Sequence, residues 1–382
     1  MKKRIVPVVT GLALIAPIVL LIINSNEGWH RHPELWETGR YAVNDLLLAV
    51  LAAELLLLAF LSFRAERRAR AGVLLMGATL LGSLVLADAY VLFVSRESAG
   101  PGGIQCLTHR NWFEQCVRNN RLGFWEDDLS PFLGQGRRDE KIIAFVGDSF
   151  TWGQGLLDRE QRFSDILDRE LEGRYRVLNF SRGGTNTQEQ INHLLPQVQK
   201  VIPDVVVLGY LANDIHDGIG WNLPQPRQPG KWEHRFMVGS PTWNYLYWKV
   251  LDPLRNAGAA DRVYQSLARS YQDEKNFREH AADLARLVDG IRAGGARPMA
   301  VILPFPHMGT SLDATTRKDI YRGVKTALEA TGTPVLDLSH LEERFPPGSF
   351  EVNSMDAHPS PEVHRAIAAE ILPWLKQQLD RP

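Results

Sequence analysis

The chain has 382 residues, of which 45% are hydrophobic, and its formal net charge is −1 at pH 7. This charge balance gives no reason to expect a nucleic-acid partner, which a strongly basic domain would favour. The average also hides a division, because the first 95 or so residues are dominated by Leu, Ala, Val and Ile, whereas the remainder has the mixed polarity of a soluble domain.

Three apolar stretches occupy the first part, at residues 5–23, 42–63 and 73–94. Each is close to the roughly 20 residues that a helix needs to cross a bilayer. The first could instead be a cleaved signal peptide, but it is longer than the usual apolar core of one, and no clear Ala-x-Ala site follows it. We therefore expect a transmembrane region over residues 1–95 with about three helices, the first of them an uncleaved anchor.

Basic residues predict the orientation of these helices. Lys2, Lys3 and Arg4 precede the first stretch, and the link between the second and third is rich in arginine at positions 64, 67, 68 and 70. The positive-inside rule places the N-terminus and this link in the cytoplasm. Three spans then put the rest of the chain on the far side, so we expect a multi-pass inner-membrane protein with a periplasmic or extracellular domain.

Two acidic residues fall inside the apolar stretches, and an ionisable group there is a functional candidate because its burial in lipid is costly. Asp88 lies near the outer end of its stretch, where it is expected to reach water. Glu54 is closer to the middle and is either neutral or paired with Thr79 or Ser83. A transport or relay pathway through these carboxylates remains an alternative role for the spans.

The segment at residues 96–140 has no clear period and is predicted to be a linker with a small docking segment. It contains the only two cysteines, Cys106 and Cys116. An oxidising compartment would let them close a short loop, so they are disulfide candidates. Free thiols remain the alternative, and a metal site is less favoured because His109 is the only other soft ligand nearby.

From residue 141 onward, short apolar runs alternate with amphipathic stretches. Strands are predicted at residues 141–146, 176–180, 204–209, 298–303 and 334–338, and helices at 159–171, 187–201, 260–292 and 361–378. Strands that are apolar throughout and alternate with helices indicate a parallel sheet covered on both faces. An insertion at about 217–295 interrupts this domain of residues 141–382, and it either shapes a binding cleft or packs against the membrane or the linker.

Polar groups follow the predicted strands where ligands bind in an open parallel sheet. The first strand runs into Gly147-Asp148-Ser149, and the second into "NFSRGGTNT". The third is followed by "LAND", and the last by "DAHP" just before the final helix.

These groups are the ones that ester cleavage requires. A serine hydroxyl needs an imidazole to accept its proton, and the imidazole needs a carboxylate to orient it. Ser149, His358 and Asp356 could fill these roles, while the N–H groups of Ser149 and Gly184 and the amide of Asn213 could bind the oxyanion. The alternatives are structural: Ser149 and Asp356 as helix caps, and Gly184 and Asn213 as turn formers.

The four segments resemble the blocks of the SGNH (GDSL-type) hydrolase family. "GDSF" is similar to its nucleophile block, "NFSRGGTNT" to the glycine block with Gly184 at the matching glycine, "LAND" to the asparagine block and "DAHP" to the acid–histidine block. Leu211 stands where the family usually has glycine, and one residue instead of two separates Asp356 from His358. The resemblance covers residues 141–378 and implies a flavodoxin-like three-layer α/β/α fold, no metal or organic cofactor, and hydrolysis of esters, often acetyl groups on carbohydrate.

We therefore expect a membrane-anchored serine esterase acting on an acylated small molecule, glycan or lipid, with O-acyl groups on envelope glycans as the favoured substrate by location and analogy. An O-acyltransferase or a lipase or lysophospholipase would use the same site. A non-catalytic glycan-binding scaffold is the alternative from another class, but such proteins commonly lose a member of the triad, and all three are present here.

Overall fold

The computed structural model describes residues 17–21, 38–100, 105–133, 140–215, 230–306, 308 and 311–380. The chain forms two compact units. The helical unit comprises residues 1–112 and 227–256, and the sheet unit comprises residues 113–226 and 257–382. Each unit is considered separately.

The sheet unit is built on five parallel strands in the order β2-β1-β3-β4-β5. The strands are β1 (Lys141–Gly147), β2 (Tyr175–Asn179), β3 (Val205–Tyr210), β4 (Arg297–Ile302) and β5 (Val335–Asp337). All of β3 is buried, as its run of apolar and β-branched residues predicts for a central strand covered on both faces. This strand order is the flavodoxin-like one, so the predicted α/β fold is confirmed.

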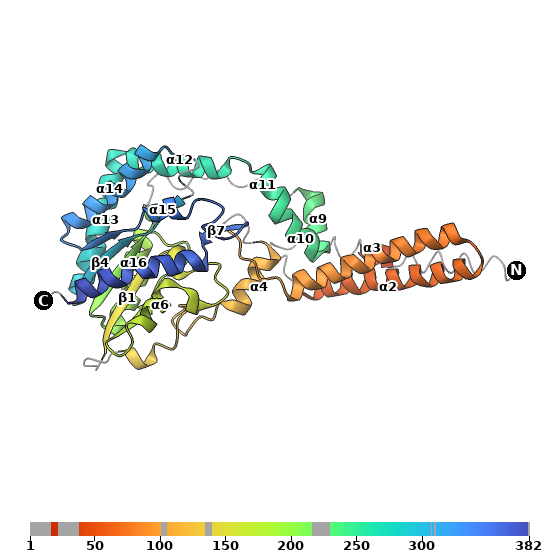
Figure 1. Cartoon of the computed structure of the whole chain (residues 1–382), viewed down its shortest axis with the longest axis horizontal. Helices are drawn as coiled ribbons and strands as arrows, with labels where there is room; N and C mark the ends of the chain where they lie inside the picture. The colour runs from red at the N-terminus through yellow and green to blue at the C-terminus, as the bar shows by residue number, and fades with distance from the viewer. Residues whose placement is uncertain are drawn as a thin grey trace. The chain divides into compact units, whose positions relative to one another are not determined.

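Helices cover both faces of this sheet (Figure 1). On one face α6 (Phe163–Glu170) packs on β2 and on α16 (Pro361–Leu379), and on the other α13 (Glu274–Ala293) and α14 (Ala314–Ala330) pack on each other and on β4. The right-handed crossovers of parallel strands produce this division. The remaining elements are α5 (Ser149–Trp152), η3 (Arg159–Gln161), α7 (Thr187–Glu189), η4 (Gln190–Leu194), α8 (Leu195–Val198), η5 (Gln199–Val201), η6 (Ala212–Asp214), α12 (Ala259–Gln272), α15 (Leu341–Arg344), and the antiparallel pair β6 (Glu351–Asn353) and β7 (Asp356–Pro359).

The predicted docking segment contains a helix, α4 (Leu107–Cys116), and a short turn, η2 (Ser130–Phe132). Its second half belongs to the sheet unit, where the Phe124 ring contacts that of Phe180 at 5.1 Å. Glu126 is buried beside Arg162, and the Glu126 carboxylate accepts the backbone N–H of Asn179 at 3.0 Å. This part of the segment is therefore integral to the sheet unit.

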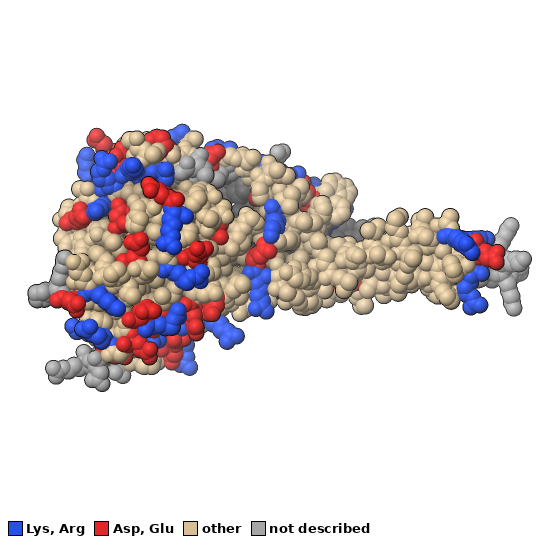
Figure 2. All heavy atoms as spheres, viewed as in Figure 1, with Lys and Arg blue, Asp and Glu red and all other residues tan. Residues whose placement is uncertain are grey.

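The helical unit contains the antiparallel pair α2 (Thr38–Arg64) and α3 (Arg68–Phe93), both long and apolar enough to cross a membrane. Figure 2 shows almost no charged residues along this hairpin and a cluster of them at its turn. These helices match the second and third predicted spans. The first, at residues 5–23, lies outside the described residues apart from 17–21, which are helical.

The first half of the insertion also belongs to the helical unit, as α9 (Lys231–Gly239), α10 (Pro241–Leu246), η7 (Tyr247–Leu251) and α11 (Asp252–Arg255). Asp88 Oδ1 accepts the Ser240 hydroxyl and the Thr242 N–H, both at 2.7 Å. The sequence suggested that Asp88 reaches water. The structure shows instead that Asp88 is fully buried and binds the N-terminus of α10. The second half of the insertion, α12 and α13, lies in the sheet unit.

Two alternatives that the sequence left open for this region are not observed among the described residues: the disulfide and the pairing of Glu54 with Thr79 or Ser83. Cys106 and Cys116 form no disulfide, because Cys106 precedes α4 and Cys116 ends it, which separates them by about 15 Å at 1.5 Å per residue, too far for an S–S bond. Thr79 donates to its own helix at Leu75 O, and no hydrogen bond among the described residues joins Glu54 to Thr79 or Ser83. Cys106 instead contacts the Thr108 hydroxyl at 3.1 Å.

Candidate active site

The nucleophile candidate lies at the carboxyl end of β1, where the strand passes into α5. Asp148 caps this short helix, and its Oδ1 accepts the Phe150 N–H at 2.9 Å, so Asp148 supports the turn that carries Ser149. A Cβ on Gly147 or Gly209 would lie 2.4 or 2.2 Å from Thr151 Oγ1. Glycine at these two positions therefore lets α5 sit directly on β1 and β3, which fixes the backbone of Ser149.

The acid and the base candidates lie on β7. Alternate residues of a strand point to the same side, so Asp356 and His358 present both side chains to one face. The His358 Nδ1 is hydrogen-bonded to Asp356 Oδ1, and the same oxygen accepts the His358 N–H at 3.3 Å. The single-residue spacing is thus what a strand requires, and the N-cap of α16 is Ser360 rather than Asp356.

The other ring nitrogen of His358 reaches the serine. Its Nε2 lies 2.7 Å from Ser149 Oγ, although the two residues are 209 positions apart in the sequence. Ser149 and His358 are only 7% and 8% exposed, and the Phe150 ring packs 5.2 Å from the imidazole. The structure therefore brings together a hydroxyl, an imidazole and a carboxylate in the connected arrangement that activates a serine.

The oxyanion-hole candidates follow the two strands that flank β1. Gly184, after β2, has φ +77°, a conformation that favours glycine, and the neighbouring Thr185 hydroxyl binds Gly147 O at 3.2 Å. Asn213 lies in η6, directly after β3. Leu211 has an ordinary extended backbone with φ −116°, so the position does not need the glycine usual in the family. The three predicted oxyanion donors thus follow the carboxyl ends of three adjacent strands: Ser149 follows β1, Gly184 follows β2 and Asn213 follows β3.

Two buried carboxylates, Asp148 and Asp214, lie next to the candidate site residues Ser149 and Asn213 in the sequence. Burial raises the pKa of Asp148 to about 6, against the lowering effects of the Phe150 N–H, His358 and the Asn213 side chain. Burial and the nearby Asp148 also raise the pKa of Asp214, which accepts the Leu211 N–H at 3.1 Å. The second oxygen of this carboxylate accepts the Gln190 amide at 3.0 Å. Asp214 therefore holds the turn that carries Asn213.

The raised pKa of Asp148 predicts a pH-dependent stability. Between about pH 4 and pH 6 the folded protein retains a proton that the unfolded chain loses, so stability falls as the pH rises through this window. Asp148→Asn keeps an acceptor for the Phe150 N–H without the charge. We expect urea unfolding to show a variant more stable than the parent by about 1–2 kcal/mol at pH 7, with no gain at pH 4. A gain of equal size at both pH values would contradict this assignment.

Several supporting residues were not singled out by sequence reasoning. Asn179, the last residue of β2, donates from Nδ2 to Thr151 O at 2.8 Å and to Ser164 Oγ at 2.9 Å, and its Oδ1 accepts the Ser181 N–H. The Thr151 hydroxyl in turn bonds Gly209 O at 3.3 Å. A polar residue ending a buried strand is the available signal for Asn179, whereas Thr151 and Gly209 show none.

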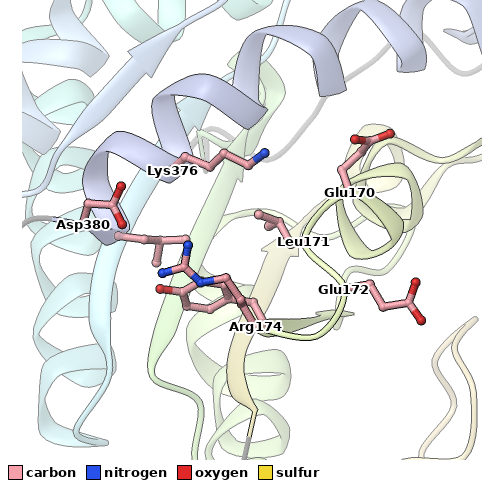
Figure 3. Close-up of a pocket in the computed structure, with 8 residues that line it drawn as sticks. Glu170, Leu171, Glu172, Arg174, Lys376 and Asp380 are labelled. Carbon is pink, nitrogen blue, oxygen red and sulfur yellow. The ribbon is translucent and has the colours of Figure 1, made fainter.

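One surface hollow lies away from this site. It has a volume of about 180 Å³ and lies between the C-terminal end of α16 and the turn from α6 to β2 (Figure 3). Tyr175, which lines it, pairs with Lys141 at the start of β1, the end opposite Ser149. Within the described part of the chain no group of three His, Cys, Asp or Glu side chains could hold a metal ion.

Solved structures with similar folds include esterases and lipases. The chain is 18% identical to TesA over 62% of its own length and 99% of that chain, with a TM-score of 0.39. It is 14% identical to the psychrotrophic esterase EstA from Pseudoalteromonas sp. (63% and 100% covered, TM-score 0.39). It is 13% identical to an extracellular lipase from Streptomyces rimosus (62% and 99% covered, TM-score 0.41).

The sequence shows no significant match to a curated protein. Residues 145–366, more than half of the chain, match the GDSL-like Lipase/Acylhydrolase family. This range contains Ser149, Gly184, Asn213, Asp356 and His358. The chain therefore belongs to the GDSL-like lipase/acylhydrolase family and is a hydrolase of ester bonds.

Proposed function

We propose that this protein is a membrane-anchored serine esterase in which Ser149, His358 and Asp356 form the catalytic triad. The observation that carries the proposal is the placement of the His358 ring, which bonds Ser149 Oγ through one nitrogen and Asp356 through the other. A histidine held in this way can take a proton from the serine while the carboxylate stabilises the resulting imidazolium.

The reaction proceeds through an acyl-enzyme. Ser149 Oγ attacks the ester carbonyl carbon as its proton passes to His358 Nε2, and the carbonyl oxygen becomes an oxyanion bound by the N–H groups of Ser149 and Gly184 and the amide of Asn213. Collapse breaks the bond to the alcohol, which leaves with the proton from His358. A water molecule then attacks the acyl carbon and gives its proton to His358; the bond to Ser149 Oγ breaks, His358 returns the proton to Ser149 Oγ, and the carboxylic acid leaves.

Membrane anchoring is supported by the surface of the α2–α3 hairpin. Large apolar side chains along it face outward, including Leu57 (59% exposed), Leu80 (64%) and Leu86 (74%), whereas the core helix of a soluble protein would bury them. Four arginines gather at and beside its turn, at positions 64, 67, 68 and 70. By the positive-inside rule this turn is cytoplasmic, and the sheet unit is extracytoplasmic.

The substrate we favour is an O-acyl group on an envelope glycan, which an extracytoplasmic sheet unit could reach. This choice rests on location and on the family's chemistry. Release of acetate from acetylated polysaccharide, measured beside release of fatty acid from phospholipid in the same reconstituted preparation, tests it. Faster release from the phospholipid would move the assignment to a lipase.

A fluorophosphonate probe tests the nucleophile. The probe phosphonylates an activated serine hydroxyl, so we expect labelling of the parent and none of Ser149→Ala. Ser181, a buried serine on the loop after β2, provides the matched control, and Ser181→Ala should keep the label. Equal labelling of the parent and Ser149→Ala would refute the nucleophile assignment.

A reporter fusion tests the sidedness. An enzyme that is active only outside the cytoplasm, fused after residue 100, should be active, and the same enzyme fused at residue 66 in the α2–α3 turn should not. Activity of the second fusion and not the first would invert the proposed topology.

A further inference from the structure

Helix α9 of the helical unit carries an exposed aromatic face. Trp232 is 69% exposed and Phe236 is 58% exposed, and residues four apart lie on the same side of a helix. The Phe236 ring also contacts that of Trp243 in α10 at 5.6 Å, edge to face. Two large aromatic side chains side by side on a surface helix indicate a surface that binds an apolar partner.

Hydrogen bonds fix α9 to one end of the α2–α3 hairpin. The Tyr41 hydroxyl donates to Met237 O at 2.9 Å, and Asn44 Nδ2 donates to Gly239 O at 3.0 Å. Asp88 of α3 binds the next helix through Ser240, as described above. Figure 1 shows α9 and α10 beside the end of the hairpin that lies away from its turn.

Helix geometry gives the depth of these contacts. Asn44 precedes Arg64 by 20 residues, and Asp88 follows Arg70 by 18, so at 1.5 Å per residue each polar contact lies about 27–30 Å from the basic turn. That separation equals the thickness of the hydrocarbon core, about 30 Å. With the arginines at the inner boundary, Asn44 and Asp88 reach the outer boundary, and α9 is held there.

The basic side chains of α9 suit a position at the outer boundary of the bilayer. Lys231 is exposed, and the Arg235 guanidinium lies 4.9 Å from the centre of the Trp232 ring. The acidic residue of the helix, Glu233, is paired with Arg255. Aromatic side chains beside Lys and Arg are the combination found where a helix lies among lipid headgroups.

We propose that α9 is an interfacial helix that lies in the outer leaflet, with Trp232 and Phe236 among the upper acyl chains and Lys231 and Arg235 at the phosphates. The partner of this surface is phospholipid, and the inference rests on the proposed membrane anchoring. Exposed apolar side chains lie on α2, on α3 and on α9, and the proposed bilayer covers all three. Contact at α9 adds an attachment beside the α2–α3 hairpin, which restricts the tilt of the helical unit.

Depth-dependent quenching by brominated lipids tests this placement in the full chain. Cys106 is fully buried and burial raises the pKa of its thiol, so Cys116→Ser alone gives a background with little reactive thiol. A polarity-sensitive fluorophore is attached to Trp232→Cys, to Leu80→Cys in the middle of α3, and to Ile202→Cys, half-exposed before β3 in the sheet unit. Each protein is reconstituted in phosphatidylcholine–phosphatidylglycerol vesicles, and retained esterase activity shows that it is folded.

We expect lipids brominated near the headgroup to quench the label at position 232 several-fold more than the label at 202, and lipids brominated near the chain ends to quench most strongly at position 80. Quenching at 80 but not at 232 would overturn the interfacial placement and leave the membrane anchor intact. Absence of quenching at 80 would overturn the anchor itself. If Trp232→Cys does not fold, Phe236→Cys replaces it with the same expected result.

Discussion

Replacing His358 with alanine is expected to lower kcat for a soluble ester by roughly 10⁴–10⁶-fold while leaving the fold intact. Without the imidazole, the Ser149 hydroxyl has no base to accept its proton and no acid to protonate the departing alcohol. The oxyanion donors at Ser149, Gly184 and Asn213 remain, so some rate enhancement over water should persist. Steady-state kinetics with a p-nitrophenyl ester measure this loss.

The double variant sharpens the test. Because the serine and the histidine act as one unit, Ser149→Ala combined with His358→Ala should be no slower than either single variant within a factor of a few. Independent contributions would instead multiply, and a double variant slower by the product would contradict the proposed mechanism.

His364 offers a matched control for the loss of an imidazole. It is fully buried in the same unit, where its Nδ1 accepts the Phe163 N–H at 3.4 Å and its ring stacks on Phe163 at 5.7 Å. Burial lowers its pKa to about 3, so it is neutral. His364→Asn should reduce stability but change kcat per folded molecule by less than tenfold. A loss comparable to that of His358→Ala would show that packing, not proton transfer, explains both.

The sequence predicts the parallel sheet well because each strand is marked by residues within the strand itself and directly after it. Each strand of the five-stranded parallel sheet is a short, mainly apolar run, and the end of such a run marks the edge where polar side chains gather. Ser149, Gly184 and Asn213 could therefore be placed at one edge before any contact was known. His358 and Asp356 required the resemblance of "DAHP" to a family block, because β7 is a four-residue strand with no apolar alternation to reveal it.

The features that escaped prediction depend on contacts between distant segments. Nothing in the sequence around Asp88 distinguishes a carboxylate that reaches water from one that caps a helix 150 residues later. The division of the insertion between the two units has the same origin. The separation of Cys106 and Cys116 follows from α4, whose mixed composition gives no helical period in the sequence.

Glu126 is the clearest example of a feature that the sequence does not reveal. The stretch "WEDDL" contains three acidic residues, but only Glu126 is buried, where it pairs with arginine side chains. Its side chain is 4% exposed and forms ion pairs with Arg162 at 3.2 Å and Arg159 at 3.1 Å. Arg162 is completely buried and also pairs with Asp165 at 2.5 Å. The same carboxylate accepts the Asn179 N–H, so Glu126 ties the docking segment to the strand that precedes Gly184.

Glu126→Ala is therefore expected to destabilise the sheet unit by about 3–5 kcal/mol, because it leaves the buried Arg162 short of one counter-charge and the Asn179 N–H without its acceptor. For a unit of this size the melting temperature should fall by roughly 10 °C. Thermal inactivation of the esterase and the near-ultraviolet circular dichroism signal both report this transition.

Asp127→Asn is the control, since it alters the adjacent carboxylate of the same network. That side chain is 60% exposed and pairs with Arg159 at 3.0 Å and Arg176 at 3.5 Å. Exposed ion pairs contribute about 0–1 kcal/mol, so the melting temperature should fall by no more than a few degrees. Equal effects of the two substitutions would mean that the total charge of the segment, rather than the buried contact of Glu126, holds it on the sheet unit. The larger loss for Glu126→Ala would instead make the docking segment a structural part of the esterase domain, beginning before the first strand.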